Sequence, residues 1–246
     1  MAVRKIVVEN KKFDIAYEII NPSKEKNIIF LHGWGSNKEI MKCFKNGFPD
    51  FRHIYIDMPG FGKSSNKYVL NTRDYARIIE EFLNSLNLSK DIVIGHSFGG
   101  KVATLLNPEI LVLLASAGIV LPKPLDVRIK IKVYKLLKKL GFANLRKIFV
   151  SDDAKGMSEN MYETFKNVVD EDFSDVFANY TGKVLIFGGY EDTAVPCAAV
   201  EKQAELFKSK NIMLNGDHYF FFNSKEAEKN RALIEKEVLK AFNDNN

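Results

Sequence analysis

The chain has 246 residues, of which 46% are apolar and 27% are charged, a composition typical of a globular protein with a substantial core. Its net charge of +5 is too mild to indicate nucleic-acid binding, and no apolar run approaches the roughly 18 residues that a transmembrane helix needs. The N-terminal segment lacks the apolar core of a secretory signal, and Cys43 and Cys197 have no metal-ligand spacing, so we expect a cytoplasmic protein with free thiols and no metal.

Short apolar runs alternate with longer helical patterns along the chain. Residues 4–9 and 13–20 are predicted to be strands joined by a hairpin turn. Apolar stripes predict a helix over residues 71–84, with Asn71 as its N-cap, and a terminal helix over 224–242. Continuous apolar runs predict buried strands at 27–31, 53–56, 91–95, 110–115, 183–187 and 211–214. This alternation predicts an α/β fold with a mainly parallel, eight-stranded sheet and helices on both faces.

Residues 119–180 interrupt the alternation with helical patterns and no convincing strand. An insertion of about 60 residues is too long for a loop, so we expect a helical lid inserted in a core made of residues 1–118 and 181–246. Within the lid, residues 127–133 alternate as in a strand, but the longer stretch 125–140 fits a helix better.

The strand at 91–95 runs into Gly95-His96-Ser97-Phe98-Gly99 and then into a helix-forming segment. A serine between two glycines at a strand-to-helix turn predicts a nucleophile elbow, with Ser97 as the catalytic nucleophile. The turn strains the serine backbone and projects its hydroxyl, and side chains at the two glycines would clash there. The helix after the turn points its N-terminal amides toward charge that develops at the site.

The general base and the acid follow from chain order, which is serine, acid and then histidine after such an elbow. His218 is the only histidine after Ser97 and follows the strand 211–214, so it is the predicted base. Asp192, just beyond the strand 183–187, is the predicted acid that fixes the tautomer of His218. Glu191 is the alternative acid, and Asp217 is expected to shape its turn.

Acyl transfer also needs amide donors where negative charge develops on the oxygen of the substrate. The backbone N–H of Phe98 is one predicted donor of this oxyanion hole. The other is the N–H of Trp34, in the loop His32-Gly33-Trp34-Gly35 that follows the strand 27–31. Packing of the Trp34 ring is compatible with this role, because the amide does the chemistry.

Across nearly its whole length the sequence resembles the α/β-hydrolase family. The matching segments, in order and approximate spacing, are His32-Gly33-Trp34-Gly35, Asp57-Met58-Pro59-Gly60-Phe61-Gly62-Lys63-Ser64, the elbow, the Asp192 loop and Gly216–His218. The resemblance implies a serine hydrolase that needs no cofactor. One departure is the helix after the elbow, which has only Gly99–Leu106 before Asn107-Pro108 and predicts a cut-back wall behind the elbow.

The interpretation that we favour is a carboxylic ester hydrolase acting on a small or medium acyl substrate. The first alternative is a C–C bond hydrolase of 2-hydroxy-6-oxo-dienoates, although those relatives usually have His-Gly-Ser-Gly in the oxyanion loop and often Asn where His96 stands. Cofactor-free haloperoxidases also keep the serine, whereas relatives that open epoxides or remove halogens have aspartate in place of Ser97. A ligand-binding receptor that reuses the fold is the non-enzymatic alternative.

The lid sequence is divided in charge: residues 120–150 carry nine basic side chains and one acidic one, and residues 151–180 carry eight acidic and two basic ones. These halves are expected to pair with each other or to face solvent. The alternative is that the basic half recruits an acidic carrier protein. Esterases of pimeloyl groups on acyl carrier protein resemble this chain in the His-Gly-Trp-Gly loop and in a basic lid. A membrane-surface role is a third interpretation.

Overall fold

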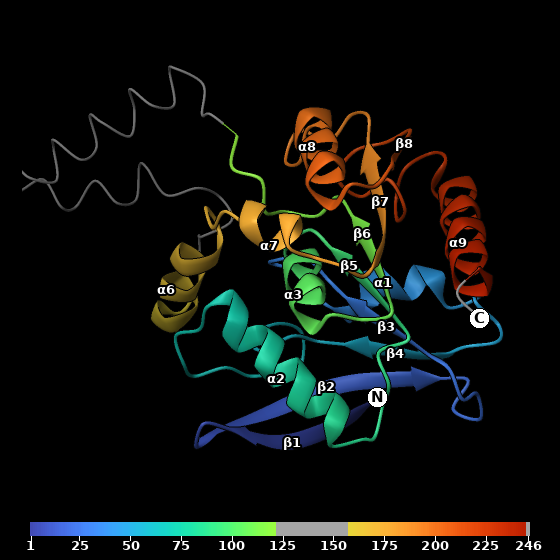
Figure 1. The fold of residues 1–246 in the computed structure, drawn as a ribbon. Helices are drawn as coiled ribbons and strands as arrows, with labels where there is room; N and C mark the ends of the chain where they lie inside the picture. The colour runs from blue at the N-terminus through green and yellow to red at the C-terminus, as the bar shows by residue number, and fades with distance from the viewer. Residues whose placement is uncertain (122–156, 245–246) are drawn as a thin grey trace, which may run out of the picture.

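The computed structural model describes residues 1–121 and 157–244 (Figure 1). They contain one eight-stranded sheet in the order β1-β2-β4-β3-β5-β6-β7-β8. Its β1–β2 and β2–β4 pairs are antiparallel, and its other pairs are parallel. The predicted α/β fold with a mainly parallel, eight-stranded sheet is therefore confirmed. The strands are β1 (Ala2–Val8), β2 (Lys11–Ile20), β3 (Asn27–Leu31), β4 (Arg52–Ile56), β5 (Ile92–His96), β6 (Ile110–Leu114), β7 (Lys183–Gly189) and β8 (Asn211–Leu214).

The central strands are buried on both faces, because successive side chains point to opposite sides of the sheet and each side is covered by helices. In β3, Ile29 and Leu31 belong to the core on one face, and Ile28 and Phe30 belong to the core on the other. The first core lies under α2 (Thr72–Asn84), α3 (Phe98–Leu106), α7 (Ser174–Ala178) and α8 (Cys197–Phe207), and α6 (Glu159–Val168) adds to it. The second lies under α1 (Lys38–Met41), the 3₁₀ turn η1 (Lys42–Phe44) and α9 (Ala227–Asn243) (Figure 1).

Local sequence signals place several turns and helix ends. Glu9 and Asn10 form the two-residue hairpin loop with φ of 48° and 63°, the backbone that matches the twist of the flanking strands. The side chain of Asn71 accepts the N–H of Asp74, whose carboxylate accepts the N–H of Asn71, so the predicted cap of α2 is a full capping box. Asn107, in the left-handed conformation, ends α3 after nine residues, which confirms the short helix after the elbow.

The structure also contains helices that the sequence pattern did not predict, namely α8, α1 and η1. In the inserted segment, α6 and α7 are helical, and the helix expected over 125–140 lies outside the described residues. Among the described helices, none combines the length and apolarity that crossing a membrane requires.

Candidate active site

Ser97 occupies a strained turn at the carboxyl edge of the sheet, between β5 and α3. Its backbone has φ 51° and ψ −115°, a conformation that L-residues rarely adopt. The turn is held by main-chain bonds, from Ser97 N–H to Leu114 O over 3.0 Å and from Ala117 N–H to Ser97 O over 3.1 Å. A Cβ on Gly95 would collide with the backbone of Gly99, so the elbow needs its flanking glycines for space.

The predicted base and acid are hydrogen-bonded to each other. His218 Nδ1 lies 2.8 Å from Asp192 Oδ2. The carboxylate of Asp192 is buried, and its other oxygen accepts the N–H groups of Ala194 and Val195 at 2.8 Å each. Since a carboxylate only accepts, His218 carries its proton on Nδ1, which leaves Nε2 with a lone pair. Glu191 is exposed, so the structure brings Asp192 to the imidazole and leaves the alternative acid outside.

His218 lies beside the elbow. The ring of His96, the residue before Ser97, is 4.7 Å from the ring of His218 between centroids. The Ser97 hydroxyl itself has no hydrogen-bond partner among the described residues. Bonds between nucleophile and base are often long in unliganded sites and tighten when substrate binds. Asp217 accepts the N–H of Tyr219 over 2.8 Å, as expected of a residue that shapes the turn.

The loop with the predicted oxyanion donor packs directly on the elbow. A Cβ on Gly33 would lie 3.2 Å from Cβ of Ser97, and Gly35 has φ 72°. The ring of Trp34 packs edge-on against Phe61 and Phe98, with centroids 4.8 and 5.5 Å apart. The structure therefore brings the segments of both predicted amide donors, Trp34 and Phe98, to the same end of the sheet as Ser97.

His32 holds this loop through two hydrogen bonds of its ring, which is in a single tautomer. Its Nε2 accepts the N–H of Met58 over 3.1 Å, so Nδ1 carries the proton and donates to Gly33 O over 2.8 Å. Complete burial lowers the pKa of His32 to about 4, so the ring is neutral near pH 7. His32 lies in the predicted loop motif, and no sequence signal indicates a role for its imidazole ring.

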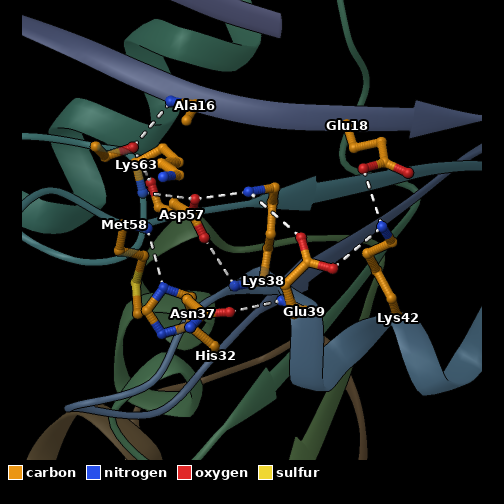
Figure 2. A network of polar contacts seen from close by, with 11 residues as sticks. Ala16, Glu18, His32, Asn37, Lys38, Glu39, Lys42, Asp57, Met58 and Lys63 are labelled. Atoms are coloured by element: carbon orange, nitrogen blue, oxygen red, sulfur yellow. Dashed lines mark hydrogen bonds and ion pairs between the residues drawn. The ribbon is translucent and has the colours of Figure 1, made fainter. Parts of the chain in front are cut away.

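The buried ion pair of Lys38 and Asp57 fixes the segment 57–64, against which the loop 32–35 packs (Figure 2). Asp57 accepts Lys38 Nζ over 2.7 Å, the Lys38 N–H over 2.8 Å and the Lys63 N–H over 2.9 Å. Ser64 donates its hydroxyl to Asp57 O and accepts the N–H of Ala16, which ties the segment to β2. Because Phe61 lies inside this segment, the ion pair sets the position of the ring that supports Trp34. The sequence does not reveal the role of Lys38, since a lone lysine gives no sign of burial.

A second buried lysine links the elbow helix to the inserted segment. Lys101, in α3, donates to Val168 O over 2.6 Å and to Glu171 Oε2 over 3.2 Å. Its ammonium lies 5.7 Å from the centre of the Phe98 ring. Burial lowers the pKa of Lys101, and the charge of Glu171 opposes that shift. The contact fixes the junction between α6 and α7 relative to the elbow.

A cavity of about 530 Å³ opens beside the elbow and the Asp192 loop. Residues 116–121, which follow β6, form one wall, and residues 169–171 and 193–196 form the others. The first wall is attached to Ser97 by the bond from Ala117 N–H to Ser97 O, and the third is attached to Asp192 by two hydrogen bonds. Most of the lining of the cavity is apolar, and Asp170 and Glu171 add carboxylates.

Comparisons with known proteins agree with this architecture. Residues 26–107 match the family model described as alpha/beta hydrolase fold. An esterase from Thermogutta terrifontis superposes with a TM-score of 0.72 over 98% of this chain and 99% of its own, at 17% identity. The chain therefore has the α/β-hydrolase fold.

Curated relatives match the chain over short segments. A 2-succinyl-6-hydroxy-2,4-cyclohexadiene-1-carboxylate synthase of Citrobacter koseri is 36% identical over 76 residues, which are 31% of this chain and 30% of that protein. A pimeloyl-[acyl-carrier protein] methyl ester esterase of Serratia marcescens is 34% identical over 55 residues, 22% of each chain. The match thus spans less than a third of either relative.

Removal of one partner of the buried Lys38–Asp57 pair is expected to destabilise the protein strongly. Asp57→Asn leaves the buried lysine charge with only the exposed carboxylate of Glu39, 3.6 Å away, which costs about 3–5 kcal/mol of the free energy of unfolding. Urea denaturation measures the loss. Asp50→Asn, which removes the exposed partner of Lys24, is the control and should change the midpoint within experimental error. Equal effects of the two substitutions would contradict this role of Asp57.

Stability is also expected to fall as the pH is lowered from about 6.5 to about 4. An unfolded histidine binds a proton below its ordinary pKa of 6.5, whereas folded His32 binds one only near pH 4. Because the unfolded state binds more protons in this window, His32 alone lowers the free energy of unfolding by about 1.4 kcal/mol per pH unit. Burial lowers the pKa of His53 and His96 as well, which acts in the same direction.

Urea titrations between pH 7 and pH 4 test this expectation. His32→Gln should unfold more easily than wild type near pH 7, and this difference should shrink toward pH 4, because the variant lacks the one proton that unfolded His32 takes up in this range. If the stability of the variant changed with pH as steeply as that of wild type, His32 would not contribute to the pH dependence.

Proposed function

We propose that the protein is a serine hydrolase that cleaves carboxylic esters of small or medium acyl groups, with Ser97, His218 and Asp192 as its catalytic triad. The 2.8 Å bond between His218 Nδ1 and the buried Asp192 carboxylate, beside a serine in a strained elbow, is the observation that carries the proposal. The bond holds His218 in one tautomer with Nε2 free to accept a proton, as a base for Ser97 requires.

In the first half of the reaction, Ser97 Oγ attacks the ester carbonyl carbon while His218 Nε2 takes the hydroxyl proton. The N–H groups of Trp34 and Phe98 donate to the oxygen that becomes negative. The bond to the alcohol then breaks, and His218 returns its proton to the departing oxygen. Asp192 stays ionised and stabilises the imidazolium that forms between these two proton transfers.

In the second half, water attacks the acyl group on Ser97. His218 Nε2 accepts a proton from this water, and the tetrahedral intermediate again uses the two amides. Collapse of the intermediate breaks the bond to Ser97 Oγ, which regains a proton from His218. The carboxylic acid leaves, and the enzyme returns to its starting state without a cofactor.

The cavity beside the Asp192 loop supports a small or medium acyl group. Its volume of about 530 Å³ lies within the range of roughly 300–1,000 Å³ that is usual for small-molecule sites. Side chains such as Ile119, Leu121 and Val195 offer an apolar surface for an alkyl chain. We propose that the inserted segment 119–180 acts as a lid, and its described part is anchored through the contact of Lys101 with the α6–α7 junction.

Substitution of the triad tests the proposal directly. Ser97→Ala and His218→Ala should each lower kcat for p-nitrophenyl esters by about 10³-fold or more, because either change removes the nucleophile or its base. Asp192→Asn should cause a comparable loss by releasing the His218 tautomer. Glu191→Gln, at the exposed neighbouring carboxylate, is the matched control and should stay within about twofold of wild type. A fluorophosphonate probe should label wild type and leave Ser97→Ala unlabelled; labelled Ser97→Ala protein, or unlabelled wild type, would refute the assignment.

The substrate class is tested by a panel of p-nitrophenyl esters of rising chain length. We expect kcat/KM to peak at a short or medium chain, because longer chains exceed the cavity, and Val195→Phe should move the peak toward shorter chains. A 2-hydroxy-6-oxo-dienoate and a carrier-linked pimeloyl methyl ester belong in the panel as comparators. The likeness to the Serratia esterase makes the carrier-linked ester the second candidate substrate. Turnover of either comparator above every simple ester would replace the present assignment.

A further inference from the structure

His96 lies between the three parts of the proposed site. It ends β5 directly before Ser97, and its side chain is almost fully buried. Its Nε2 lies 3.0 Å from the backbone oxygen of His218. A Cβ on Gly33 would lie 3.0 Å from its Nδ1, so the oxyanion loop packs against the opposite edge of the ring.

The partners of the ring fix its protonation. A backbone carbonyl only accepts, so Nε2 of His96 carries the proton and donates it to His218 O. Burial, together with the charge that His218 can carry, holds the pKa of His96 well below its usual range. Nδ1 therefore keeps a lone pair, and this buried atom has no partner in the part of the chain that the structure describes. A buried acceptor without a partner, such as this Nδ1, costs free energy of folding. This cost indicates that the ring is retained for the hydrogen bond that Nε2 makes on its other side.

Neighbouring rings hold His96 in this orientation. Its centroid lies 4.7 Å from that of His218, 5.2 Å from Tyr219 and 5.0 Å from Phe221. All three rings belong to the loop that presents the base. The hydrogen bond and these contacts make His96 the link between the residue before the nucleophile and the main chain of the base.

We propose that His96 is a positioning residue, whose Nε2–H bond to the backbone of His218 sets the placement of the base relative to Ser97. The inference rests on the proposed function and deepens it. Asp192 fixes the ring of His218 through its side chain, and His96 fixes the same residue through its main chain. Two anchors of this kind define where Nε2 of His218 lies, and a displacement of about 1 Å in such a site can cost 10²-fold in rate.

Two variants of similar side-chain length test the bond. His96→Gln keeps an N–H donor at the reach of the imidazole Nε2, and His96→Met fills a similar space without a donor. We expect His96→Met to lower kcat by about 10- to 100-fold with little change in KM, and His96→Gln to recover kcat to within about fivefold of wild type. His96→Asn, which ends short of the carbonyl, is the second loss variant if His96→Met does not fold.

His53 supplies the matched structural control. It is buried like His96, and its Nε2 lies 3.0 Å from a backbone oxygen, that of Phe48, on β4 away from the elbow. His53→Met should lower the urea concentration at the midpoint of unfolding. It should leave kcat unchanged when the amount of active enzyme is taken from fluorophosphonate labelling of Ser97. A purely structural role of His96 would give the same pattern, with no difference in kcat between His96→Met and His96→Gln, and this would overturn the inference.

A proton NMR measurement separates this inference from the proposed function. The His218 Nδ1–H that bonds to Asp192 gives a downfield resonance, identified by its loss in Asp192→Asn. We expect the resonance to shift or broaden in His96→Met and to recover in His96→Gln, whatever the substrate. An unaltered resonance with wild-type kcat in His96→Met refutes the role of His96, whereas full activity in Ser97→Ala refutes the triad instead.

Discussion

The close approach of backbone segments around Ser97 is the constraint on which the rest of the site depends. Ser97 holds a positive φ only because its neighbours allow the chain to turn without a Cβ: Gly95 contacts the backbone of Gly99, and Gly99 contacts the end of β3. Gly33 then lets the oxyanion loop lie against the serine from outside. The parallel strands β3, β5, β7 and β8 end at the same edge of the sheet, and this brings together the loops that carry the proposed catalytic residues.

Buried polar groups, rather than apolar packing alone, hold the loops that surround the elbow. Loops leave the sheet where its hydrogen-bonded ladder ends, so each needs other partners for its orientation. His32 supplies one bond within its own loop and one to Met58 in the segment that follows β4, and the Lys38–Asp57 pair supplies several more. These groups are costly to bury and become more costly if one partner is lost. The stability of the site therefore depends on pH and on single side chains, because these buried polar groups hold its loops in place.

In the proposed function, attack on the ester bond and choice of substrate belong to different parts of the chain. The proposed triad rests on loops fixed to the sheet, whereas the cavity lies between those loops and the inserted segment. Lys101 joins the two, since it belongs to the elbow helix and binds the α6–α7 junction. Small changes in the inserted segment can thus alter the cavity while the nucleophile, base and acid keep their geometry.

The sequence alone determined the features that depend on local backbone chemistry and on apolar periodicity. The eight strands, the Asn71 cap, the elbow and the short helix after it follow from such patterns, and fold-level chain order pointed to Asp192 and His218. Only the tertiary structure decided that Asp192, and not Glu191, contacts the imidazole of His218. Two adjacent carboxylates in a loop look alike in the sequence, and the folded loop sets the direction of each side chain. The tertiary structure also decided the roles of Lys38, Lys101, His32 and His96. Their burial depends on contacts between segments distant in the chain, and no local pattern records those contacts.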